Sequence, residues 1–134
     1  MIKYLLDTDT FSQMVKGIHP GIVERMDSLP TDEAALSVIT RGEIQYGLEL
    51  NPIRAAWRKR LDLLLSAFAT LGLEADAALH YAQLRAQLSR KGTPIGPNDL
   101  WIAAHARAAN LILVTHNTRE FSRVPQLKIE NWLA

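Results

Sequence analysis

The sequence contains no cysteine among its 134 residues. This absence excludes a disulfide scaffold, a thiolate zinc site, an iron–sulfur cluster and a cysteine nucleophile. No apolar run approaches the roughly 20 residues that a membrane-spanning helix requires. The apolar stretch near the N-terminus is too short for a signal peptide. We therefore expect a cytoplasmic protein without a membrane segment, whose 48% hydrophobic residues build one core.

Neither sign of charge predominates, because the formal net charge is only +1. Its distribution is uneven: residues 1–50 carry 8 acidic and 4 basic residues, and residues 51–134 carry 6 acidic and 11 basic ones. Such asymmetry can place an acidic site beside a surface for a polyanion, but an ordinary solvated surface explains it equally well. The basic residues available for phosphate contacts include Arg54, Arg58, Lys59, Arg85, Arg90 and Lys91.

Short apolar runs alternate with helical patterns along the whole chain. Strands are predicted at residues 2–7, 34–39, 71–74, 111–115 and 127–132. Apolar residues recur at helical spacing within residues 11–18, 22–29, 40–48, 51–68, 77–88 and 100–109. This alternation predicts one α/β domain over residues 1–134, with a short parallel sheet flanked by helices on both faces. In such sheets, ligands bind outside the carboxyl ends of the strands.

Four carboxylates lie where the carboxyl ends of the predicted strands would gather them: Asp7, Glu43, Asp99 and Glu120. Each also has a purely structural interpretation. Asp7 or Asp9 can cap the next helix, and Thr40 with Glu43 has the spacing of a capping box. Asp99 can complement a helix dipole, and Glu120 can be a solvated loop residue. For any one acid alone, the structural interpretation is the better one.

The four acids together favour a catalytic site. Crowded carboxylates repel one another and lose hydration unless a cation offsets them. Carboxylate ligands without cysteine or paired histidines select Mg²⁺ or Mn²⁺ over zinc. Asp7 and Asp99 border apolar segments, so we expect these two to hold the metal. Such a site hydrolyses phosphodiester bonds.

Four segments resemble one known family in order and spacing, namely LLDTDT, SVITRGEIQYG, RKGTPIGPNDLWIAAHA and LVTHNTREFSRVPQLKIENW. Over nearly the whole chain, they resemble the VapC toxins of the PIN-domain ribonucleases. The resemblance implies a PIN-like fold, a homodimer and an endoribonuclease that depends on Mg²⁺ or Mn²⁺. Asp7, Glu43 and Asp99 match the family's acids, and Glu120 matches a position that is often Asp. Asn117 matches a polar residue near the metals.

The resemblance further implies a substrate and a partner. Members with similar segments cut initiator tRNA in its anticodon loop, and their usual partner is a VapB-type antitoxin that blocks the active site. Two residues depart from the family pattern, since Asp9 and His116 stand where relatives commonly have Asn. We expect Asp9 to cap the following helix and His116 to be a solvent-exposed loop residue. Thr8 and Asp9 join Asn117 as residues that support the acids or touch the substrate.

Two alternatives remain at this level. Asp7-x-Asp9 after an apolar strand also resembles the haloacid-dehalogenase phosphatases, with Asp7 as the nucleophile. Phe11 stands where that family has Thr or Val, and the chain is short for it. The other alternative is a non-catalytic PIN-like module that only binds RNA or a partner. Loss of an acid usually marks such modules, and here all four positions are filled.

Overall fold

The computed structural model describes residues 1–133 and confirms the alternation of strands and helices. The strands are β1 (Tyr4–Leu6), β2 (Ala34–Ser37), β3 (Ala69–Leu71), β4 (Ile112–Val114) and β5 (Ile129–Glu130). The helices are α1 (Thr8–Lys16), α2 (Pro20–Ser28), α3 (Val38–Leu50), α4 (Ala55–Ala67), α5 (Ala75–Arg90), α6 (Pro97–Ala108) and α7 (Thr118–Phe121), with a 3-10 turn at Thr31–Glu33. No helix within residues 1–133 has the length and apolar character needed to cross a membrane.

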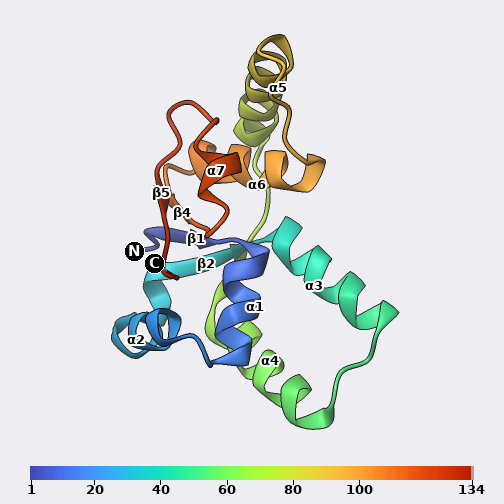
Figure 1. Cartoon of the computed structure of the whole chain (residues 1–134), viewed down its shortest axis with the longest axis vertical. Coiled ribbons are helices and arrows are strands. Elements are labelled where there is room, and N and C mark those ends of the chain that lie inside the picture. Colours follow the sequence, from blue (N-terminus) through green and yellow to red (C-terminus); the bar gives the residue numbers. More distant parts are fainter. Residues whose placement is uncertain (134) are drawn as a thin grey trace.

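The five strands form one parallel sheet in the order β3-β2-β1-β4-β5. Successive side chains of a strand point to opposite faces, and the central strand β1 shows this directly. Leu5 packs into a cluster with α5 and α6, whereas Leu6 packs into a second cluster with α1, α2 and α4. The two helix layers lie on opposite sides of the sheet (Figure 1). The predicted sheet flanked by helices on both faces is therefore correct.

The order in which strands are added to the sheet reverses between β1 and β4. From β1 the chain proceeds to β2 and β3 on one side, and it then crosses to β4 and β5 on the other. The backbone amide of Asp7 donates a hydrogen bond of 3.0 Å to the carbonyl of Val114, so the carboxyl ends of β1 and β4 lie side by side. A crevice opens where strand order reverses in this way, and the candidate acids lie around it.

All five strands differ from the sequence prediction at their ends. Strands β1, β4 and β5 are shorter than predicted by one or two residues at each end, and β2 and β3 differ for identifiable reasons. The third strand spans residues 69–71 rather than 71–74, and Ala69 and Thr70 are exposed. It is an edge strand, so no apolar run marks it. The second strand ends at Ser37 rather than at residue 39, because the Ser37 side chain accepts a hydrogen bond from the amide of Ile39 and begins α3 there.

Candidate active site

A cavity of about 330 Å³ lies at the carboxyl edge of the sheet. It is lined by Asp7, Thr8, Asp9, Ser12, Glu43, Asp99, His116, Asn117 and Phe121. We call it the acid cavity. Three of the four predicted acids line it. The fourth, Glu120, is not among the lining residues, but it accepts a hydrogen bond from Asn117, which lines the cavity. The strand order thus brings together side chains that are more than 100 positions apart in sequence.

Asp7 follows β1 and is the N-cap of α1. Its Oδ1 atom accepts a hydrogen bond of 2.8 Å from the amide of Thr10, and the residue is 5% exposed. Burial raises the pKa of Asp7, and hydrogen bonds from Thr115 and Thr10 oppose that rise. Of the two caps that the sequence offered, Asp7 is confirmed, and the expectation that Asp9 caps the helix is wrong. Asp7 therefore combines a structural role with a position in the acid cavity.

Glu43 lies in the second turn of α3, and its carboxylate points toward α1. The Thr8 hydroxyl donates a hydrogen bond of 2.6 Å to Glu43 Oε1. The predicted capping box of Thr40 and Glu43 is wrong, because the helix begins earlier and Ser37 is its N-cap. A glutamate freed from capping is available to the cavity, and Thr8 holds it there.

Asp99 and Glu120 approach each other from the first turn of α6 and from α7. Burial raises the pKa of Asp99 to about 6, and the negative charges of Glu120, Glu43 and Asp7 add to the rise. Glu120 is held by the side-chain amide of Asn117 at 2.7 Å and by the backbone amide of Gly96 at 3.2 Å. The four predicted acids therefore share one electrostatic environment.

This donor set suits a hard divalent cation. Among residues 1–133, no three carboxylate or imidazole groups converge closely enough to hold a metal ion as they stand. The chemistry nevertheless fits, because the groups are oxygen donors of one sign. The pKa of Asp99 is raised by burial first and then by repulsion from the other carboxylates. Among the residues that the structure describes, no lysine or arginine lines the cavity. A bound Mg²⁺ or Mn²⁺ would offset this repulsion.

Asp9 and His116 form an ion-pair contact at the mouth of the acid cavity. The His116 Nδ1 atom lies 2.5 Å from Asp9 Oδ2, and both side chains are about half exposed. His116 follows β4, so the contact joins the loop after β4 to the first turn of α1. His116 is an exposed loop residue, as the sequence predicted, and it additionally contacts Asp9. The two residues that depart from the family pattern contact each other.

His105 fixes the start of α3 from the opposite helix layer. It is 4% exposed, and its Nδ1 atom lies 2.8 Å from the hydroxyl of Ser37, the residue that caps α3. Burial lowers the pKa of His105, and a hydrogen bond with the Gly72 backbone partly opposes this. The neutral imidazole thereby supports the helix that carries Glu43.

This burial predicts a specific dependence of stability on pH. Unfolded His105 takes up a proton near pH 6.5, whereas the folded protein keeps it neutral to a lower pH. The free energy of unfolding should therefore fall as pH drops below about 6.5. In His105→Gln that contribution is absent. Urea unfolding of the wild type and of His105→Gln at pH 7.5 and 5.5 measures this contribution. An equal pH dependence of the free energy of unfolding in the two proteins would contradict the role of His105.

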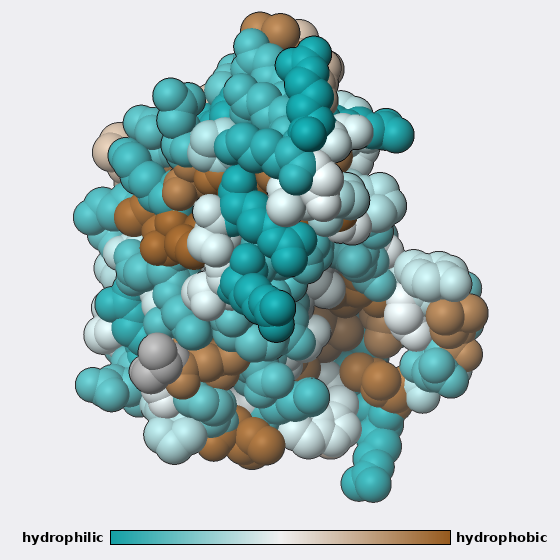
Figure 2. Space-filling model, turned by 45° about the horizontal axis from the view of Figure 1, so that its top comes forward, coloured by the Kyte–Doolittle hydropathy of each residue, from teal (hydrophilic) through white to brown (hydrophobic). Residues whose placement is uncertain are grey.

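A second and larger cavity, of about 690 Å³, adjoins the acid cavity between α1, α3 and α4. Its apolar lining residues are Phe11, Val15, Ile18, Ile44, Leu48, Ile53, Trp57 and Leu61. Thr8, Ser12 and Glu43 line both cavities. The space-filling view shows a hollow with hydrophobic surface beside the projecting end of α3 (Figure 2). We call this cavity the apolar groove.

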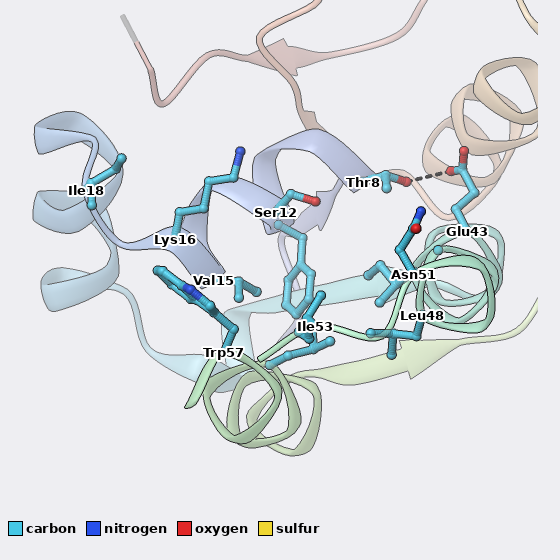
Figure 3. Close-up of a pocket in the computed structure, with 14 residues that line it drawn as sticks. Thr8, Ser12, Val15, Lys16, Ile18, Glu43, Leu48, Asn51, Ile53 and Trp57 are labelled. Carbon is cyan, nitrogen blue, oxygen red and sulfur yellow. Dashed lines mark hydrogen bonds between the residues drawn. The ribbon is translucent and has the colours of Figure 1, made fainter. Parts of the chain in front are cut away.

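The sequence did not reveal this groove. Ile53 and Trp57 belong to the apolar helical pattern within residues 51–68, but both are about 40% exposed. Figure 3 shows the side chains of α1, α3 and the start of α4 facing one another across the groove. Periodicity marks an apolar face without telling whether it is covered, and here it is partly open.

The six basic residues selected from the sequence lie outside both cavities. Arg58 pairs with Asp62 at 3.2 Å, and Arg85 donates to the Tyr81 hydroxyl at 2.9 Å. Lys16, which no sequence pattern singled out, lines the groove instead. Its spacing of eight residues from Thr8 was a usable signal, because residues at that interval share a helix face.

The fold is an α/β domain with acids around the switch point of its parallel sheet, and a PIN-domain family model matches residues 4–127. The chain is 39% identical to the "tRNA(fMet)-specific endonuclease VapC" of Salmonella typhimurium over 98% of its own length and 99% of that protein. It is 35% identical to "Ribonuclease VapC2" of Rickettsia felis, over 96% and 97%.

Solved structures of VapBC complexes contain chains with the same fold. The Rickettsia felis VapBC2 complex bound to promoter DNA contains a chain with a TM-score of 0.88 and 35% identity, covering 98% of this chain and 99% of that one. DNA-bound VapBC from Salmonella typhimurium gives a TM-score of 0.84 at 40% identity, with the same coverage. The chain therefore belongs to the VapC ribonucleases of the PIN-domain family. This finding overturns the haloacid-dehalogenase alternative and argues against a non-catalytic module.

Proposed function

We propose that this protein is the toxin of a VapBC-type toxin–antitoxin system and cleaves RNA with the help of Mg²⁺ or Mn²⁺. The observation that carries the proposal is the convergence of Asp7, Glu43 and Asp99 on one cavity at the switch point of the sheet. Full-length similarity to proteins named ribonuclease VapC supports it. Residues 1–134 then act as one PIN domain in the cytoplasm.

The roles of the residues follow from their positions. Asp7 and Asp99 would hold the metal, with Glu43 and Glu120 completing the catalytic acids. When bound, the ion supplies charge stabilisation on the phosphodiester and favours attack by water. Thr8 orients Glu43 at 2.6 Å, and Asn117 orients Glu120 at 2.7 Å. These two polar residues hold carboxylates that would otherwise repel each other.

The proposed substrate is a tRNA anticodon loop, first that of initiator tRNA. A relative with 39% identity bears the name tRNA(fMet)-specific endonuclease. A small domain with a net charge of +1 has few groups with which to read a long base sequence. It can instead accept unstacked bases of an exposed loop. A splayed loop therefore suits this cavity better than duplex RNA or DNA.

The direct test is cleavage of purified initiator tRNA. With Mg²⁺ or Mn²⁺, we expect one cut in the anticodon loop, and removal of the metal with EDTA should stop the reaction. The cut is mapped by sequencing the fragments. Elongator tRNAs and a messenger RNA at the same enzyme concentration serve as controls. Cuts scattered along the messenger RNA, with tRNA intact, would contradict the tRNA substrate and leave the ribonuclease proposal standing.

The proposed partner is a VapB-type antitoxin, because the similar solved structures are VapBC complexes. The apolar groove offers it a cavity of about 690 Å³ whose lining includes Thr8 and Glu43. A segment bound there would reach the acid cavity and block it.

We also propose a homodimer, supported by exposed Val38 and Tyr46, which line a shallow hollow beside Glu43.

A further inference from the structure

Lys16 is the only lysine or arginine, among the residues that the structure describes, that lines either the acid cavity or the apolar groove. It is the last residue of α1 and is exposed. Within residues 1–133 it forms no ion pair. A positive charge without a partner beside a cavity of carboxylates is available to an anionic ligand.

Lys16 lies on the same face of α1 as Thr8 and Ser12, which line the acid cavity. Thr8, Ser12 and Lys16 are spaced at intervals of four residues, so their side chains follow one another on α1. At 1.5 Å per residue, Lys16 lies about 12 Å along the helix from Thr8. Figure 3 shows the three side chains in succession, with the Lys16 ammonium standing clear of the Trp57 ring. The face forms a polar edge that leads from the acid cavity along the groove.

A purely structural role for Lys16 is already served by another residue. A cation in the last turn of a helix can stabilise the terminal carbonyl groups. Arg60 does this for α1, because its guanidinium donates to the carbonyls of Met14, at 3.1 Å, and Val15. The Lys16 ammonium is therefore not needed at the helix end.

We propose that Lys16 is a substrate-positioning residue that binds a phosphate of the RNA strand near the scissile one. This inference rests on the proposed ribonuclease function. With the scissile phosphate at the acids, the strand runs along Thr8 and Ser12, and its next phosphates come within reach of the ammonium. The contact offsets the repulsion that a polyanion meets at a cavity of acids. It also holds the strand in register with the acids.

The test uses Lys16→Ala, the conservative Lys16→Arg, and Lys128→Ala as a matched control. Lys128 is an exposed lysine just before β5, at the opposite edge of the sheet from the acids. Binding of a fluorescein-labelled anticodon stem-loop RNA is measured in an Asp7→Asn background, so that the RNA stays intact. Kinetics are measured in the otherwise wild-type chain.

We expect Lys16→Ala to weaken RNA binding about tenfold, as for one charged hydrogen bond. The slope of log Kd against log salt should fall in size by about 0.7, the value for one phosphate contact on a single strand. KM should rise while kcat changes little, because the contact is made equally in the ground and transition states. Lys16→Arg should retain both, and Lys128→Ala should resemble the wild type.

Three results would overturn the inference. Lys16→Ala with the affinity and salt slope of Lys128→Ala would show that no phosphate is bound there. Equal loss in Lys16→Ala and Lys16→Arg would point to shape rather than charge. Weakened binding of an antitoxin peptide, with RNA binding unchanged, would assign the lysine to the partner. A wild-type chain that neither binds nor cleaves RNA would instead remove the proposed function on which the inference rests.

Discussion

Asp7→Asn should abolish RNA cleavage and leave the fold intact. The substitution removes one negative charge from the proposed metal site, and loss of a group that acts on transition-state charge reduces turnover by about 100-fold or more. Asn is as good an N-cap as Asp, so the hydrogen bond from the Thr10 amide is retained. Because burial raises the pKa of Asp7, its charge destabilises the metal-free protein. We expect the variant to be as stable as the wild type or more stable.

The experiment measures single-turnover cleavage and urea unfolding on the same preparations. Asp27→Asn is the matched control, since Asp27 is exposed on α2 and lines neither cavity. It should cleave RNA at the wild-type rate. Cleavage by Asp7→Asn at that rate in Mg²⁺ would remove Asp7 from the site. A loss of activity accompanied by a loss of stability would instead assign it to the fold alone.

Expression of the wild-type chain without its partner should arrest bacterial growth, and expression of Asp99→Asn should not. Burial raises the pKa of Asp99 to about 6, and the charges of three neighbouring carboxylates add to the rise. Substitution by Asn relieves that repulsion and removes a proposed metal ligand. The variant should therefore accumulate as folded protein without toxicity. Colony counts at matched protein levels give the measurement.

Co-expression provides the second half of this test. A small open reading frame is expected next to the gene, and its product should restore growth to cells that express the wild-type chain. The restored cells must still contain the toxin, which immunoblotting establishes. Equal growth with wild type and Asp99→Asn, at matched levels, would contradict the toxin proposal. Growth arrest that the neighbouring product fails to relieve would contradict only the proposed partner.

Local sequence patterns were sufficient for the outline of the fold. The apolar runs of β1, β2 and β4 are buried and continuous, as strands covered on both faces must be. The helices between them carry apolar residues at helical spacing. The pattern failed where burial is slight, as at the edge strand β3. There Ala69 and Thr70 face solvent, so hydrophobicity does not mark the strand.

The helix caps show a second limit of prediction from local sequence patterns. Residue spacing favoured Asp9 and the pair of Thr40 and Glu43 as caps, and each was off by a few positions. Asp7, the other cap that the sequence offered, and Ser37, which it did not, are the caps, because each is the residue at which the chain leaves a strand in extended conformation. Several residues near a helix start are chemically capable of capping. Only the backbone geometry at the end of the strand selects one of them.

The sequence by itself determined that this protein is an α/β domain with acids after its strands, because both features depend on neighbours along the chain. The tertiary structure decided which side chains meet. Asp9 contacts His116, Ser37 contacts His105, and Thr8 contacts Glu43 only because the strand order places β1 between β2 and β4. The open groove and the position of Lys16 beside it have the same origin. Short-range propensities carry no information on which distant faces pack together and which stay uncovered, since that choice is made by the folded chain as a whole.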